Sequence, residues 1–107
     1  MDKHDYELGL EPLLPEYVNP DLWLDENHCI EFTKLRDDVF PCGAILWHRK
    51  PYNALSATPG WCAGGFQWRG PGIHWELHSL SPLHVEPSIR CSCGEHGFIR
   101  DDKWVPA

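Results

Sequence analysis

Two thiols and one imidazole lie within six residues near the end of the chain. Cys91 and Cys93 flank a single serine, and His96 follows Cys93 at a spacing of three positions. Thiolate sulfur and imidazole nitrogen are ligands that zinc binds well, and Gly94 permits a sharp turn between them. The segment therefore indicates either a metal knuckle or a small reactive site. A third interpretation makes Cys91 and Cys93 small buried apolar side chains on a hairpin.

A complete zinc site needs a fourth ligand from elsewhere in the chain. We expect Cys62, because it would tie a long loop at about residues 50–64 to the C-terminal hairpin and add rigidity to a loop-rich domain. The expected zinc ligands are Cys62, Cys91, Cys93 and His96. Other candidates for the fourth position are Cys42, His74 and His78.

The same histidine also offers a catalytic interpretation. Ser88 precedes His96 by eight residues, and residues that far apart can face each other across a hairpin. Ser88 would then be a nucleophile and His96 its general base, with Asp101, Asp102 or Glu86 as the orienting carboxylate. A two-residue turn at Cys93-Gly94 would instead pair Cys91 with His96 and Ser88 with Ile99, unless a bulge shifts the register.

These residues must be positioned by short strands. Beyond residue 27, apolar and β-branched runs alternate with Gly and Pro, and no long helical period appears. The expected strands are Cys29 to Lys34, Ala44 to His48, Gly65 to Trp68, Ile73 to Ser79, His84 to Arg90, Gly97 to Arg100, and Trp104-Val105. The pattern predicts one small, mostly β, antiparallel domain at residues 28–107, either a sandwich or a partly open barrel, with a C-terminal β-hairpin.

Residues 1–27 carry the whole net charge of the protein. This extended arm holds eight acidic residues and one lysine, whereas eight acids balance eight bases in the remaining 80 residues. We expect the arm to pack on the core, because leucines and aromatic residues are interleaved with its acids. Asn19-Pro20 could begin one helical turn that runs to Asp25. An acidic arm repels phosphate backbones and attracts basic surfaces, so we expect a protein partner with a basic surface and no nucleic acid.

Composition also indicates where the protein acts. No run approaches the roughly 18 apolar residues of a membrane span, and the N-terminus lacks the basic-then-apolar order of a signal peptide. Five cysteines is an odd number, which favours thiols or metal ligation over a disulfide framework. We therefore expect no membrane association and a cytoplasmic location.

The C-terminal segment resembles known sequences. Residues 86–107, with the Cys-Gly-Glu-His-Gly-Phe-Ile run and the Trp-Val-Pro-Ala ending, are similar to the closing segment of small uncharacterised proteins of actinobacterial phages. More distantly, Pro87-Ser88-Ile89, Cys91, His96 and Phe98-Ile99-Arg100 resemble a bacterial domain family of unknown function. Some members of that family occur in ubiquitin-like operons and are regarded as serine peptidases. The resemblance implies Ser88 as nucleophile and His96 as base.

Two functions follow as hypotheses. The first is a phage-type accessory protein that binds a host protein to inhibit or redirect it, with a structural zinc at the hairpin. The second is a Ser88/His96 hydrolase that acts on a peptide or isopeptide bond.

Overall fold

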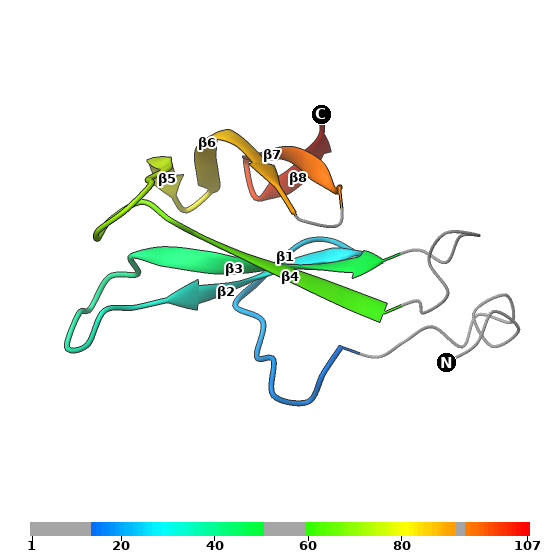
Figure 1. Ribbon diagram of the computed structural model, residues 1–107, viewed down its shortest axis with the longest axis horizontal. Helices are drawn as coiled ribbons and strands as arrows, with labels where there is room; N and C mark the ends of the chain where they lie inside the picture. Colours follow the sequence, from blue (N-terminus) through cyan, green and yellow to red (C-terminus); the bar gives the residue numbers. More distant parts are fainter. Residues whose placement is uncertain (1–13, 51–59, 92–93) are drawn as a thin grey trace, which may run out of the picture.

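The chain folds into two stacked antiparallel sheets. A computed structural model describes residues 14–50, 60–91 and 94–107, and these contain strands and no helix. The eight strands are β1 (Leu22–Asp25), β2 (His28–Thr33), β3 (Gly43–Lys50), β4 (Gly60–Gln67), β5 (Glu76–Leu80), β6 (Leu83–Arg90), β7 (His96–Arg100) and β8 (Lys103–Pro106). The first sheet has the order β1-β2-β3-β4 and the second β5-β6-β7-β8, and Figure 1 shows the second sheet lying above the first. The predicted mostly β sandwich is confirmed, and the sheets do not close into a barrel.

The core lies between the two sheets. Every second side chain on β3 and β4 points toward the second sheet, and Ala44, Leu46 and Phe66 among them are fully or almost fully buried. Leu83, Val85 and Ile99 meet them from β6 and β7, and each has no exposed area. Alternate side chains of β3 and of β6 thus form the two facing layers of this core.

A second cluster covers the outer face of the first sheet. Val18 packs there against Cys29 and Trp47, and Leu14 and Trp61 lie at its border. The chain segment before β1 therefore supplies apolar side chains to a strand face that would otherwise meet water. The rest of the acidic arm, residues 1–13, lies outside the described residues.

The predicted helical turn at Asn19 to Asp25 is wrong. Residues Leu22–Asp25 form strand β1, which pairs antiparallel with β2. Leu22 and Leu24 pack on the core while Trp23 between them is half exposed, which is the period of a strand. A tight turn at residues 26–27, in which the Asn27 N–H donates to the Asp25 carboxylate, returns the chain to β2. Pairing with β2 satisfies the backbone, which one isolated helical turn could not do.

Two further strand boundaries differ from expectation. β5 begins at Glu76, and Ile73 is 82% exposed, because the connection after β4 turns at Gly70 and Gly72, whose φ angles are positive. β3 extends to Lys50 and β4 begins at Gly60, so strands occupy both ends of the predicted 50–64 loop. Residues 51–59 lie outside the described part of the chain.

Candidate metal centre

Three metal-binding side chains converge where the two sheets meet. The ligand atoms of His48, Cys62 and Cys91 lie within 4.8 Å of one another. His48 is 2% exposed, Cys91 is 4% exposed, and Cys62 is half buried. Within the described residues, these three side chains form a group that could hold a metal ion.

Strand register brings the first two of these residues together. His48 on β3 is the direct partner of Cys62 on β4, and directly opposite residues of an antiparallel pair project to the same face. That face looks toward the second sheet. Two positions along β4 on the same face, a Cβ at Gly64 would lie 3.9 Å from Cys91 Sγ, so the absence of a large side chain there leaves room for the sulfur.

Cys91 arrives from the second sheet, directly after β6. Its N–H donates to the Glu95 carbonyl at 2.8 Å, and its own carbonyl accepts from the Gly94 N–H at 2.9 Å. Gly94 has a φ of 101°, which suits a three-residue hairpin loop whose last residue is left-handed. The hairpin backbone therefore fixes Cys91 at the edge of the core.

The separations suit zinc. Cys62 Sγ and Cys91 Sγ are 3.5 Å apart. Two thiolates at about 2.3 Å from a tetrahedral zinc would be separated by about 3.8 Å, and a thiolate and an imidazole nitrogen by about 3.6 Å. Small rotations of the side chains would therefore complete a Cys₂His set. The donor chemistry is that of zinc or another soft or borderline ion rather than of calcium or magnesium, which prefer oxygen.

A second histidine, His28, packs against His48. His28 stacks on His48 with ring centroids 6.0 Å apart, and on the Trp104 indole at 4.7 Å. Its Nδ1 lies 2.8 Å from an Asp25 carboxylate oxygen and its Nε2 lies 2.9 Å from one of Glu95. Both carboxylates can only accept, so both bonds form together when the imidazole carries both protons. The ring links the first sheet to β8 and to the β6–β7 hairpin beside the metal ligands.

The structure brings together only part of the predicted ligand set. Cys62 and Cys91 are neighbours, as the sequence suggested. His96 is instead hydrogen-bonded to Ser88, and Cys93 lies outside the described residues. His48 was missed, although its alternation with Ala44 and Leu46 on β3 marks it as an inward-facing side chain.

The expected hairpin register is wrong by one residue. Arg90, not Cys91, pairs with His96, and Ile89 pairs with Gly97. The reason is the length of the loop: the bond from the Cys91 N–H to the Glu95 carbonyl leaves three residues between them instead of two. A register shift between Val85 and Ile89 then adds residues to β6 relative to β7.

That irregularity places Ser88 beside His96. Ser88 Oγ and His96 Nε2 are 2.7 Å apart, and both residues are half buried. Within the described residues, no carboxylate bonds the other nitrogen of His96. Glu86 binds His84 and Arg100, and Asp102 accepts from the Leu83 N–H. The pair therefore has the distance of a nucleophile and base without the third member of a triad.

Two other titratable groups are perturbed. Burial, helped by the Glu31 charge, raises the pKa of the Cys29 thiol to about 11. A hydrogen bond from His84, with the nearby Arg100 guanidinium, lowers the pKa of the Glu86 carboxyl. Cys29 thus stays a neutral core thiol, and Glu86 stays an ionised surface group.

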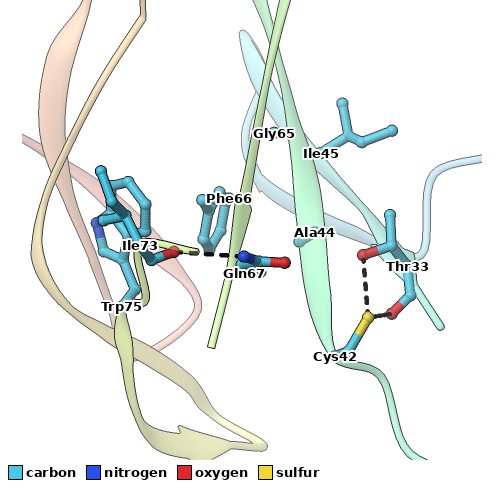
Figure 2. Close-up of a pocket in the computed structure, with 9 residues that line it drawn as sticks. All are labelled: Thr33, Cys42, Ala44, Ile45, Gly65, Phe66, Gln67, Ile73 and Trp75. Atoms are coloured by element: carbon cyan, nitrogen blue, oxygen red, sulfur yellow. Dashed lines mark hydrogen bonds between the residues drawn. The ribbon is translucent and has the colours of Figure 1, made fainter. Parts of the chain in front are cut away.

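The opposite end of the sandwich exposes apolar side chains. Val39 is 79% exposed, Phe40 67% and Ile73 82%, and these lie on the β2–β3 and β4–β5 connections, at the other end of β3 and β4 from His48 and Cys62. Ile73 lines a hollow of about 350 Å³, and in Figure 2 Ile73 and Trp75 lie on one side of Phe66 and Gln67, with Thr33 and Cys42 on the other. A second hollow of about 440 Å³ is lined by Phe40, Pro41, Trp68, Arg69, Leu77 and Leu80. We call Val39, Phe40, Ile73 and the two hollows the apolar end.

Comparison with known proteins gives no match: no family model, no curated protein and no solved structure is similar to this chain. No helix in the described part of the chain is long and apolar enough to cross a membrane. The resemblance to phage proteins and to a peptidase family stays a prediction.

Proposed function

We propose that the chain is a zinc-stabilised β-sandwich that binds a host protein in the bacterial cytoplasm and inhibits or redirects it. The observation that carries this proposal is the apolar end. Its three large side chains are each 67% exposed or more; Ile73 lines one of the two hollows and Phe40 lines the other. Exposed large apolar side chains can anchor a protein partner, and nearby hollows can receive anchoring side chains of that partner.

Charge indicates the chemistry of the partner. The chain has a formal net charge of −7, all of it on residues 1–27. A negative arm accelerates encounter with a positive surface and repels nucleic acid. A protein with an apolar protrusion and a basic rim around it could contact the apolar end through the protrusion and the acidic arm through the rim.

Zinc has a structural role in this proposal. Its ligands come from β3, β4 and the end of β6, so one ion joins both sheets at the end opposite the apolar surface. Metal affinity adds to folding free energy when the unfolded chain lacks a formed site. The ion would hold the sandwich closed and keep the apolar end in one shape.

Matched histidine variants test the metal proposal. His48→Ala should abolish stoichiometric zinc, measured by elemental analysis after purification without chelator, whereas His96→Ala should retain it. Cys91→Ser should also lose zinc. Zinc that depends on His96 and not on His48 would contradict this ligand set, and zinc absent from the unmodified protein would contradict the proposal.

Paired surface variants test the binding proposal. Phe40→Ser with Ile73→Ser should abolish crosslinking to the host partner and leave the thermal midpoint unchanged, because both side chains are exposed. Tyr17→Ser is the control, since Tyr17 is 79% exposed but packs on Trp47 at the outer face of the first sheet. A partner captured equally well by the double variant would remove the apolar end from the proposal.

The second candidate function is a hydrolase, and the 2.7 Å contact between Ser88 Oγ and His96 Nε2 favours it. A neutral imidazole at that distance can accept the serine proton during attack on a carbonyl. Two observations favour the binding function instead: His96 lacks a carboxylate partner within the described residues, and neither hollow is lined by Ser88 or His96.

A reactive-serine probe separates the two functions. Under the binding proposal, a fluorophosphonate should leave the protein unlabelled and Ser88→Ala should not alter partner binding. Stoichiometric labelling that disappears in Ser88→Ala and in His96→Ala would favour the hydrolase.

A further inference from the structure

We infer that Cys62 and Cys91 form a peroxide-sensitive pair, which a hydroperoxide converts to a disulfide with release of the metal ion. The inference rests on the proposed zinc site and adds its regulation. The same two sulfurs would bind the metal ion in reducing conditions and form a covalent bond with each other after oxidation.

The geometry allows either bond. The two sulfurs are 3.5 Å apart although their residues are 29 positions apart in the chain, Cys62 on β4 of the first sheet and Cys91 directly after β6 of the second. A disulfide needs about 2.05 Å, so the sulfurs must approach by about 1.5 Å, which rotation about the Cα–Cβ bonds can supply. The structure describes Cys62 and Cys91 without a disulfide between them.

Burial assigns the order of the two steps. Cys62 is half buried on β4, an edge strand of the first sheet, whereas Cys91 is 4% exposed. A peroxide therefore reaches Cys62 first, and Cys91 is placed to resolve the product. The thiolate is the form of each cysteine that reacts.

The reaction balances with the hydroperoxide as oxidant. Cys62 thiolate attacks one peroxide oxygen, the O–O bond breaks, and a sulfenic acid forms as hydroxide leaves and takes up a proton. Cys91 thiolate then attacks the Cys62 sulfur, the S–S bond forms, and the S–O bond breaks with loss of a second water. Two thiolates, one hydrogen peroxide and two protons give one disulfide and two waters. The zinc ion leaves unchanged because its two sulfur ligands are consumed.

The other described cysteines are poor competitors. Cys29 has no exposed area, and burial raises its pKa to about 11, so its thiolate is scarce. Cys42 is 8% exposed, and its thiol donates to the Thr33 carbonyl at 3.5 Å. Oxidation should therefore select the Cys62–Cys91 pair among these four.

The test treats zinc-loaded Cys93→Ser protein with hydrogen peroxide. Cys93 is replaced because trypsin leaves it in the same peptide as Cys91, between Arg90 and Arg100, while Cys62 falls between Arg49 and Arg69. We expect one zinc released to a chromogenic chelator for each disulfide formed, and a crosslinked tryptic pair that identifies Cys62 and Cys91. Dithiothreitol with added zinc should restore the metal-bound state.

Controls separate this inference from the metal proposal. Cys42→Ser should release zinc at the unmodified rate, while Cys62→Ser should form no disulfide. Zinc-loaded protein that keeps its metal under peroxide, or that oxidises at other cysteines, would overturn the inference and leave the zinc site standing. Protein that never binds zinc yet forms the disulfide would instead overturn the zinc site.

Discussion

Gly97 on β7 is a position at which one added methyl group should strongly destabilise the fold. A Cβ there would lie 2.5 Å from Trp104 Cζ2, 2.6 Å from Trp104 Cε2 and 2.7 Å from the Val105 carbonyl oxygen. Trp104 is 7% exposed and stacks on His28, which stacks on His48 of the candidate metal centre. Gly97→Ala must therefore displace the indole and the paired strand β8 together.

The size of the effect follows from these contacts. Carbon atoms in van der Waals contact lie about 3.5–4.0 Å apart, so the neighbours must retreat by about 1 Å. Overpacking of this kind costs about 1–3 kcal/mol, and a disturbed ring stack costs about 0.5–1.5 kcal/mol more. We expect a loss of about 3 kcal/mol, which lowers the thermal midpoint by about 12–24 °C in a domain of this size.

Thermal and urea unfolding with saturating zinc would measure this loss. Gly65→Ala is the matched control: Gly65 is also in a strand and is exposed, and a Cβ added there would meet no atom within 4 Å. The control should be neutral or stabilised by up to about 1 kcal/mol. If Gly97→Ala unfolds within about 0.5 kcal/mol of Gly65→Ala, a difference no larger than an ordinary surface change, the steric reasoning is refuted.

Three further predictions concern charge. Glu95→Gln should lower the free energy of unfolding in urea by about 1–2 kcal/mol, because it weakens the bond to the buried His28. The control Glu76→Gln, in an exposed pair with His78, should lower it by less than about 1 kcal/mol. Equal losses would contradict a stabilising link between the sheets through His28. Because burial raises the Cys29 pKa from 9.0 to about 11, the unfolded thiol ionises first, so stability should fall between about pH 9 and pH 11. In Cys29→Ala the free energy of unfolding should fall less steeply over this pH range. An unchanged dependence on pH would exclude the Cys29 thiol as the cause. Deleting residues 1–7 should lower the association rate with the partner at low salt. The difference in rate between the full and the shortened chain should shrink near physiological ionic strength, where the Debye length is about 8 Å. Equal association rates at low salt would leave the arm with a role in solubility alone.

Local pattern was enough to predict the class of fold. Short alternating runs bounded by Gly and Pro indicate strands whatever lies around them, and β2, β3, β6 and β7 begin or end within one residue of their expected limits. β1 was the exception among the elements. Its four residues carry a weak pattern, and only pairing with β2 decides between a strand and a turn.

The site depended on contacts that the sequence does not contain. Thiols and an imidazole at residues 91–96 indicated the type of ligand chemistry, because that chemistry belongs to the residue. Which histidine joins Cys62 and Cys91 depends on register and on how two sheets stack. A three-residue hairpin loop turned His96 toward Ser88, and the β3–β4 register set His48 opposite Cys62.

Sequence alone therefore determined the class of fold, most of its strands, the location of the charge and the kinds of chemistry available. Tertiary structure alone decided which of those groups meet. The reason is that a strand's side chains alternate with a period of two, so a register change of one residue moves each of them to the opposite face. No local pattern near Cys91 records that choice, because it is made by the loop bonds of Cys91 and by the packing of the second sheet on β3 and β4.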